Sequence, residues 1–332
     1  MTLREKNSLR KNGAEAEGPV ERVGNSPAIA IVGPTGSGKS EAALQLAAEF
    51  DGEVVNCDSI QIYRYFDIGS AKLSVAERRG IPHHLIDIVN PDALFTAGDF
   101  ARVGRETLRL IAERGRLAVI TGGTGFYLRS LVEGLAAGPR RDEILRERLR
   151  ARESEKPGFA HRMLSRLDPD TAGRIHPNDA PKVIRALEIC LSARRKASEV
   201  FAAGRDALEG FRVLKIGLFP DREALYQRLE TRVKSMFEAG LIEETASILA
   251  RGYSPQAKPF ESIGYKQALQ AIDGTLSAQQ ALFHATQATR RYAKRQMTWF
   301  RQEPGIGIFS GFGDDPAVIR KISERIRDWL AC

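Results

Sequence analysis

The stretch AIAIVGPTGSGKS, residues 28–40, decides the fold of this 332-residue chain. Its first five residues are an apolar run typical of a buried strand. Residues 33–40 match the pattern G-x-x-x-x-G-K-[ST], and residues 41–49 continue with helical periodicity. A glycine-rich turn between strand and helix points successive backbone N–H groups at a phosphate, at the positive end of the helix dipole. The stretch predicts a di- or triphosphate ligand, without specifying ATP or phosphate transfer.

This phosphate loop (P-loop) supplies the first group of candidate site residues. Its glycines at 36 and 38 allow the backbone angles that a close approach to phosphate requires. Lys39 places a positive charge at the terminal phosphate, and the hydroxyl of Ser40 is a ligand for Mg²⁺. A glycine-rich turn that fits the pattern by chance is the alternative, and the flanking strand and helix disfavour it. The phosphate-binding residues are Gly33, Pro34, Thr35, Gly36, Ser37, Gly38, Lys39 and Ser40.

Composition narrows the class of protein. No apolar run reaches the ~18 residues that a membrane span needs, so we expect no membrane association. Residues 1–26 are polar and lack the apolar segment of a secretory signal, so they are predicted to be a disordered extension. The three cysteines stand far apart, with no spacing that indicates zinc or disulfides. These features predict a cytoplasmic protein.

Predicted strands and helices alternate on either side of the central segment of the chain. Apolar runs at 53–57, 116–121 and 211–219 are predicted strands, and 96–114, 277–302 and 315–330 are predicted helices. We therefore expect an α/β fold, a P-loop NTPase-like, mostly parallel sheet flanked by helices, formed by residues 27–138 and 210–332.

The residues between these two parts have a different character. Residues 139–209 contain helical, strongly basic segments and no predicted strand, in a chain whose formal net charge is +8. We expect an all-helical insertion domain. Its positive charge has two interpretations, a solvated helical surface or a nucleic-acid-binding face, and repeated arginines beside a phosphate site favour the second.

Four positions each allow more than one role. Asp58 follows a strand beside the P-loop and is a metal ligand, a general base or a helix cap. The glycine turn at 122–127 also follows a strand, which favours a pocket over a plain turn. Arg232 is a surface ion-pair partner or a phosphate ligand. The pair His83-His84 is a metal site or, as we favour, an ordinary feature of a strand edge.

Seven passages together resemble bacterial tRNA dimethylallyltransferases, also called tRNA isopentenyltransferases. The similarity extends from residue 29 to residue 301. The resemblance implies transfer of a dimethylallyl group from dimethylallyl diphosphate to the N6 amine of the adenosine at tRNA position 37, with release of diphosphate. The passages are GPTGSGKS (33–40), DSIQIYRYFDIGSAK (58–72), PHHLIDI (82–88), GGTGFY (122–127), DPDTAGRIHPND (168–179), IGYKQ (263–267) and ATRRYAKRQMTWFR (288–301).

The resemblance also implies roles for individual residues. Asp58 is the expected general base, Thr124 borders the reactive centre, and Arg232 contacts the diphosphate. The expected partners are the tRNA anticodon stem-loop, dimethylallyl diphosphate and Mg²⁺, and the enzyme is expected to be a monomer. The residues expected to contact tRNA are Asp58, Ser59, Ile60, Gln61, Thr124, Arg146, Lys182 and Arg185.

Some positions depart from the family pattern. Ala180-Pro181-Lys182 replaces a segment in which members often carry Gln and Arg, and Glu261 stands where many carry a basic residue. The zinc-finger tail of eukaryotic members has no counterpart here. A P-loop kinase acting on a small metabolite or nucleoside, and a nucleic-acid-binding NTPase without group transfer, are the competing functions. Residues 58–72 and the basic insertion favour the prenyltransferase over both.

Overall fold

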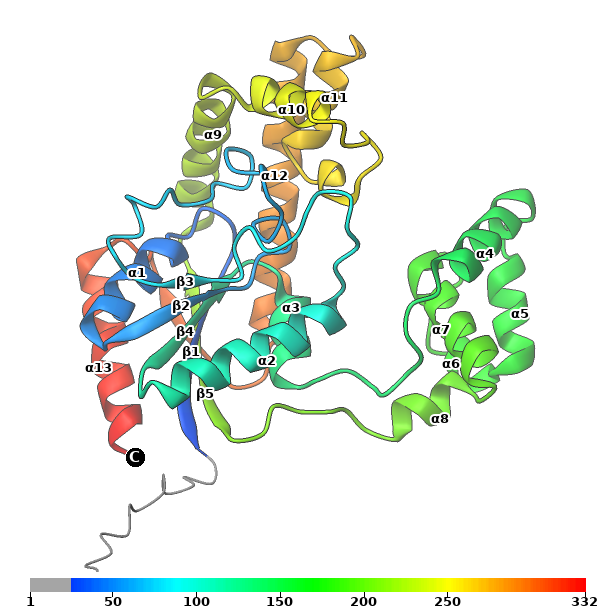
Figure 1. Ribbon diagram of the computed structural model, residues 1–332, viewed down its shortest axis with the longest axis horizontal. Helices are drawn as coiled ribbons and strands as arrows, with labels where there is room; N and C mark the ends of the chain where they lie inside the picture. Colours follow the sequence, from blue (N-terminus) through cyan, green and yellow to red (C-terminus); the bar gives the residue numbers. More distant parts are fainter. Residues whose placement is uncertain (1–24) are drawn as a thin grey trace, which may run out of the picture.

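The structure, a computed structural model, describes residues 25–332 (Figure 1). Residues 1–24 of the predicted extension 1–26 lie outside the described residues. Its last residue, Ser26, already belongs to strand β1, and the backbone N–H of Ser26 donates to Gly210 O.

A six-stranded sheet in the order β3-β2-β4-β1-β5-β6 forms the centre of the α/β part. Every neighbouring pair is parallel, which agrees with the predicted fold class. Parallel strands place all their carboxyl ends at one edge, and there the loops that follow β1, β2 and β4 meet. The strands are β1 (Ser26–Val32), β2 (Gly52–Asn56), β3 (His83–His84), β4 (Leu117–Gly122), β5 (Phe211–Phe219) and β6 (Ile306–Ser310).

Helices cover both faces of the sheet because successive strand residues point to opposite sides. In β1, Ile29 and Ile31 pack with α1 (Lys39–Glu49) and α13 (Pro316–Ala331). The alternate residues, such as Ala30, belong to a second core with the helices of the other face. These helices are α2 (Ala97–Glu113), α3 (Gly125–Val132), α9 (Arg222–Glu238) and α12 (Ala278–Arg301).

Three short helical elements extend this second layer beyond the sheet edge. They are α10 (Leu241–Ala250), η1 (Lys258–Glu261) and α11 (Tyr265–Ile272). Figure 1 shows them beside the upper ends of α9 and α12, above the loops that follow β2 and β3. Within residues 25–332, no helix combines the length and apolar character that crossing a bilayer requires.

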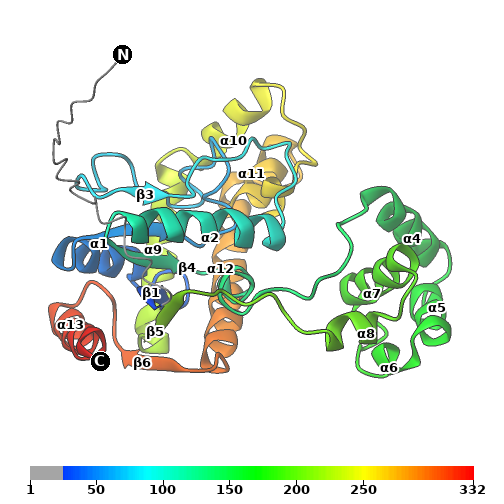
Figure 2. The same cartoon turned by 60° about the horizontal axis from the view of Figure 1, so that its bottom comes forward.

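The insertion is a separate group of five helices, set apart from the sheet in both views (Figures 1 and 2). Its buried residues form their own cluster, which includes Leu164, Val183 and Leu187. Two segments connect it to the sheet part, and they touch through an antiparallel bridge between Ala136 and Arg205. The helices are α4 (Glu143–Glu155), α5 (Phe159–Leu167), α6 (Pro169–Ala172), α7 (Ala180–Ala193) and α8 (Ala197–Ala202).

A charged cluster fastens α4 to α7 inside this insertion. Glu188 is fully buried and accepts two hydrogen bonds from Arg146, at 3.0 and 2.6 Å. Arg185 also donates to Glu188, and so does the backbone N–H of Asp142. Burial alone raises the pKa of Glu188, but the bonds from Arg146 and Arg185 hold it below its ordinary value. Glu188 is therefore a charged group that depends on its two arginines.

We expect Glu188→Ala to unfold the insertion selectively. The substitution leaves two arginines facing a buried gap, and removing one partner of a buried pair costs about 3–5 kcal/mol. Hydrogen exchange of peptides from residues 143–202 should rise, while peptides from the sheet keep their protection. Glu147→Ala, at an exposed position without an ion pair in the described chain, is the control. Equal protection in both variants would contradict the assignment.

Candidate functional site

The P-loop has the geometry that phosphate binding requires. Gly36 and Gly38 have φ angles of 79° and 82°, in the left-handed region that favours glycine. Gly38 caps the N-terminus of α1, so the free N–H groups at the start of that helix point into the space enclosed by the loop. The hydroxyl of Ser37 is buried and has no hydrogen-bond partner among the described residues. An anion in the loop would satisfy the free N–H groups of the helix.

Two cations stand beside the P-loop without a carboxylate bound to either. Burial, followed by the nearby Arg232, lowers the pKa of Lys39 to about 8, although Asp58 acts in the opposite direction. Burial likewise lowers the pKa of Arg232, with Arg228 adding to the effect. Within residues 25–332 neither Lys39 nor Arg232 forms an ion pair, so the surface-pair interpretation of Arg232 is wrong. Their charge is left for a bound anion.

Asp58 faces these cations from the end of β2. One carboxylate oxygen, Oδ1, accepts the backbone N–H of Ile60 at 2.8 Å and that of Gln61 at 3.4 Å. The sequence left open a helix cap among three roles, but a turn and no helix follows Asp58, so the contact caps a turn. It also fixes the direction of the carboxylate, which lines the cavity described next. A structural role and a chemical role are compatible, because Oδ2 takes no part in the turn.

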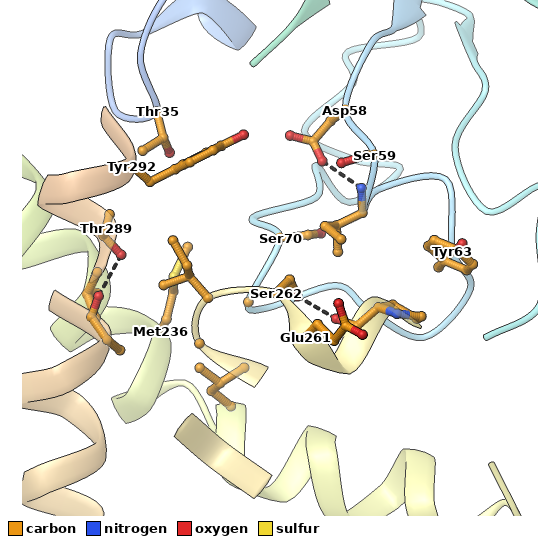
Figure 3. A pocket seen from close by; sticks show the side chains of 18 of the residues that line it. Thr35, Asp58, Ser59, Tyr63, Ser70, Met236, Glu261, Ser262, Thr289 and Tyr292 are labelled. Carbon is orange, nitrogen blue, oxygen red and sulfur yellow. Dashed lines mark hydrogen bonds between the residues drawn. The ribbon is translucent and has the colours of Figure 1, made fainter. Parts of the chain in front are cut away.

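One cavity connects the P-loop, Asp58 and Arg232. Its volume is about 460 Å³, and it is bounded by α9, α12, η1 and the loop after β2. Figure 3 shows Tyr292 extending from α12 toward Asp58, with Thr35 of the P-loop beside it. The wall formed by α9 and the segment that follows it is mainly apolar. Its apolar residues include Val233, Met236, Phe237 and Leu241.

Two residues of α12 join the P-loop to the glycine turn after β4. The side-chain amide of Gln296 accepts the N–H of Thr35 at 2.8 Å and donates to Gly123 O at 2.7 Å. One turn earlier, Tyr292 lies within hydrogen-bonding reach of Thr124 and Gln296, and burial raises its pKa. The sequence analysis missed both residues. Their common helical face, at positions i and i+4, was the available signal.

Thr124 borders the cavity from the start of α3. Its hydroxyl oxygen accepts the backbone N–H of Ser59 at 3.1 Å, which ties the turn after β4 to the turn after β2. Gly122 permits this approach, since a Cβ there would lie 2.1 Å from Cys57 O. The glycine turn also contributes Tyr127 to the lining of the cavity, so it is part of the pocket, as the sequence analysis favoured.

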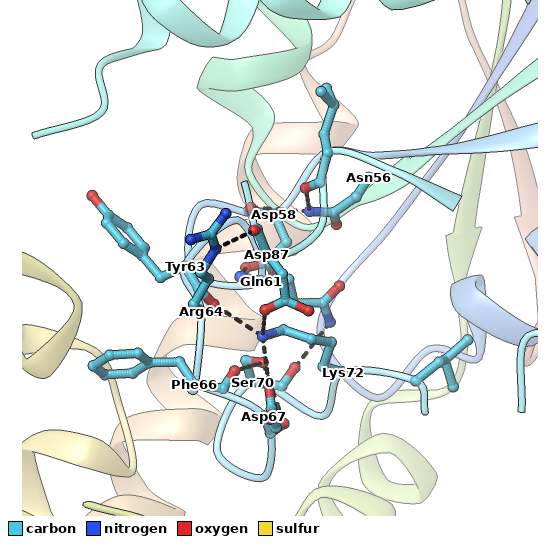
Figure 4. Close-up of polar contacts among 12 residues, drawn as sticks. Asn56, Asp58, Gln61, Tyr63, Arg64, Phe66, Asp67, Ser70, Lys72 and Asp87 are labelled. Atoms are coloured by element: carbon cyan, nitrogen blue, oxygen red, sulfur yellow. Dashed lines mark hydrogen bonds and ion pairs between the residues drawn. The ribbon is translucent and has the colours of Figure 1, made fainter. Parts of the chain in front are cut away.

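A buried lysine organises the loop that carries Asp58. The Nζ of Lys72, whose side chain is only 3% exposed, lies 2.7 Å from Asp87 and 2.9 Å from Tyr63 O (Figure 4). It also bonds Asp67 at 2.5 Å. Gln61 completes the fold of the loop by donating to Ser70 O at 3.0 Å. Residues 58–72 therefore form a compact structure rather than an extended loop.

A second anchor holds the same loop from α10. The carboxylate of Glu244 accepts the N–H of Ile68 at 2.9 Å and also bonds the buried hydroxyl of Tyr265. Tyr265 in turn accepts the N–H of Gly69 at 3.1 Å. Burial raises the pKa of Glu244, and the hydrogen bonds it accepts oppose that rise.

The residues expected to contact tRNA fall into two groups. Asp58, Ser59 and Ile60 line the cavity, with Thr124 at its border, whereas Gln61 turns inward to Ser70. The other group, Arg146, Lys182 and Arg185, lies on the separate insertion. Lys182 is exposed, but Arg146 and Arg185 are already engaged with Glu188, so their tRNA contacts remain predictions.

His84 and Glu261, two positions that the sequence analysis singled out, each form an ordinary ion-pair contact. The Nε2 of His84 lies 2.6 Å from Glu53, which also pairs with Arg114, at the edge strand β3. Glu261 lines the cavity and pairs with Lys258. Among residues 25–332 no three histidine, cysteine or acidic side chains gather as a metal site.

A P-loop that opens into a partly apolar cavity, with a carboxylate facing it, defines an enzyme that acts on a phosphorylated substrate. A family model described as IPP transferase matches residues 61–303. The chain belongs to the IPP transferase family.

Similar proteins cover nearly the whole chain. The tRNA dimethylallyltransferase of Solibacter usitatus is 57% identical over 304 residues, which are 92% of this chain and 99% of the relative. That of Koribacter versatilis is 52% identical over 90% of this chain and 97% of its own.

Solved structures agree with this assignment. The full-length tRNA isopentenylpyrophosphate transferase from Bacillus halodurans is 36% identical with a TM-score of 0.69, covering 92% of this chain and 97% of its own. A eukaryotic dimethylallyltransferase acting on tRNA is 29% identical with a TM-score of 0.80, and the match covers 92% of this chain and 80% of that structure's chain.

The pKa of Lys39 predicts a pH dependence of anion binding. Lys39 is charged below about pH 8 in the free protein, so affinity for a non-hydrolysable dimethylallyl diphosphate analogue should fall as the pH rises through that value. Calorimetric titration between pH 7 and 10 measures this. Lys39→Arg keeps its charge throughout, so its affinity should stay level above pH 8. A decline of equal size in both proteins would exclude Lys39 as the cause.

The buried position of Lys72 predicts a specific defect in the loop. Lys72→Met should loosen residues 61–72 at a cost of about 1–3 kcal/mol, because two carboxylates and a carbonyl lose their donor. Hydrogen exchange of the loop should increase, and kcat/KM for tRNA should fall. Lys234→Met, the same substitution at an exposed position of α9, is the control. An unchanged loop in Lys72→Met would show that Glu244 alone holds it.

Proposed function

We propose that this enzyme transfers a dimethylallyl group from dimethylallyl diphosphate to the N6 amine of the adenosine at tRNA position 37, and releases diphosphate. The observation that carries the proposal is the single cavity shared by the P-loop, Arg232 and Asp58. The relatives named above as tRNA dimethylallyltransferases support the same reaction. We further propose that the enzyme works as a cytoplasmic monomer.

The diphosphate binds in the P-loop. Its charge is neutralised by Lys39 and Arg232, which have no competing carboxylate bound to them in the described chain. In the reaction, the bond between the allylic carbon and the phosphate oxygen breaks, and the oxygen keeps the electron pair. Fixed cations and N–H donors stabilise the charge that develops on this oxygen. The apolar wall from α9 suits the five-carbon group.

Asp58 accepts the proton of the attacking amine. As the new C–N bond forms, the nitrogen becomes positive and loses one proton to the carboxylate. The turn contact with Ile60 fixes the carboxylate before substrate arrives. Thr124 and Tyr292 lie beside it and orient the adenine. The target base must leave the stack of the anticodon loop, which costs a few kcal/mol.

The residues around the P-loop fit a magnesium ion held largely by the substrate. Mg²⁺ prefers oxygen ligands and commonly binds through one or two protein groups together with substrate phosphates. Ser40, the second residue of α1, is exposed and offers one hydroxyl oxygen as a ligand. When bound, Mg²⁺ would neutralise charge on the leaving diphosphate.

The insertion contributes affinity for tRNA. Two connecting segments set it apart from the sheet (Figure 1). Lys182 presents an exposed charge there, while Arg146 and Arg185 combine support of α7 with any contact to phosphate.

Asp58→Asn provides the sharpest test of the mechanism. Asparagine keeps the Oδ1 acceptor of the turn, so the loop should fold normally while the proton acceptor is lost. We expect kcat to fall by about 10²- to 10⁴-fold, with tRNA affinity changed by no more than roughly threefold. Filter binding and single-turnover prenylation measure the two quantities. Wild-type turnover in this variant would assign the proton transfer to another group.

Labelled donors separate the proposal from the kinase and NTPase alternatives. The enzyme is incubated with tRNA, Mg²⁺ and either dimethylallyl diphosphate labelled in the allyl group or γ-labelled ATP. Label should enter tRNA only from the first donor. Entry from ATP would identify a kinase, and ATP hydrolysis without label in tRNA would identify an NTPase.

A further inference from the structure

Helix α12 carries an unusual surplus of positive charge. Its 24 residues contain no acidic side chain and five lysines or arginines. Of these five, only Arg290 forms an ion pair within residues 25–332, with Glu230 at 2.7 Å. Arg291, Lys294, Arg295 and Arg301 have no carboxylate partner there. A helix face whose charge is left unbalanced is suited to a polyanion.

Two exposed aromatic residues continue this basic face away from the cavity. Trp299 is 37% exposed and lies one turn beyond Arg295, which lines the cavity. Phe126 is 51% exposed and comes two residues after Thr124, at the start of α3. We call Phe126, Arg129, Arg295 and Trp299 the aromatic–basic strip.

The close contact of α3 with α12 brings the strip together. A Cβ on Gly125 would lie 2.1 Å from Nε1 of Trp299, so only glycine lets the indole lie across the start of α3. The guanidinium of Arg129 lies 4.5 Å from the centre of the indole ring. Arg129 is itself held by Glu303 at 2.9 Å, and Glu303 is fixed by Lys215. The indole is therefore a rigid surface that remains partly exposed to solvent.

We propose that the aromatic–basic strip binds the anticodon-loop nucleotides that flank the extruded adenosine, with Trp299 and Phe126 stacking on their bases. This inference rests on the proposed function. Aromatic side chains beside arginines are a surface that single-stranded nucleic acid uses, because every base has a stacking face. Arg295 has no carboxylate partner within residues 25–332, whereas Arg129 is paired with Glu303 and supports the indole. Position adds a second argument, since Arg295 belongs to both the strip and the cavity wall.

Stacking here would also offset the cost of extruding the target base. When one adenosine enters the cavity, its neighbours lose a stacking partner in the loop. A rigid indole one helical turn from Arg295, which lines the cavity, replaces that partner without ordering a mobile side chain. The strip would therefore contribute most to the extruded state, and less to the first encounter with the stem.

The two tryptophans of the chain make a direct test possible. Trp329 lies on α13, where it packs under Arg212, so Trp329→Phe leaves Trp299 as the only indole. We expect its fluorescence to be quenched by a 17-nucleotide anticodon stem-loop RNA. The quenching should shrink when a flanking nucleotide is made abasic. Equal quenching by intact and abasic RNAs, or none, would overturn the proposal.

Substitutions test the energetic contribution. Trp299→Leu and Phe126→Leu should each weaken RNA binding at least about fivefold, whereas Trp299→Phe should retain most of the affinity. The effect of Trp299→Leu should largely disappear with RNA that is abasic at the contacted position. If the losses of affinity caused by Trp299→Leu and by the abasic nucleotide were fully additive, stacking between them would be excluded.

Phe283→Leu is the matched control. Phe283 is also exposed, at 58%, and belongs to the same helix. It is about 24 Å from Trp299 along the axis and about 160° around it. Its substitution should leave RNA affinity unchanged. Equal losses in Phe283→Leu and Trp299→Leu would point to general destabilisation of α12.

Failure of this inference is distinguishable from failure of the proposed function. If wild-type enzyme prenylates the stem-loop but Trp299 gives no base-dependent signal, the strip is not the contact surface. If no dimethylallyl group is transferred at all, the proposed function itself fails. Each experiment uses the full chain.

Discussion

The structure depends on an electrostatic imbalance at the end of β1. The P-loop directs backbone N–H groups and the positive end of α1 at one point, and two further cations face the same point without carboxylates bound to them. Burial already lowers the pKa of Lys39 and Arg232, which means that the folded protein holds this charge at a cost. A bound anion would remove that cost. The N–H groups of the P-loop, with Lys39 and Arg232, therefore favour an anionic substrate at this point.

The parallel sheet places the other chemical groups around this point. Asp58 follows β2 and Thr124 follows β4, so both strands deliver their side chains to the same edge. Helix α12 then crosses behind them, and Gln296 bonds the P-loop on one side and the glycine turn on the other. The loop of residues 58–72 closes the arrangement through Lys72. The site is therefore held by contacts between segments far apart in the chain.

Local sequence patterns were sufficient for most of the fold. Apolar runs and the P-loop pattern predicted β1, β2, β4 and β5, because each signal lies within a few residues. The P-loop, Asp58 and the glycine turn were likewise visible, since they follow predicted strands. The engagement of Arg146 by Glu188 was not visible, because that contact joins two helices at positions 42 residues apart. Gln296 was missed for the same reason, as its partner Thr35 is 261 residues away.

The two segments that lead to and from the insertion meet at Ala136 and Arg205, whose α-carbons are about 5 Å apart as in any bridge pair. A chain could pass directly from one segment to the other through a short turn, leaving every strand in place. The insertion is thus a separate unit with its own hydrophobic core. Its sequence can therefore diverge between relatives without disturbing the strands that carry the pocket.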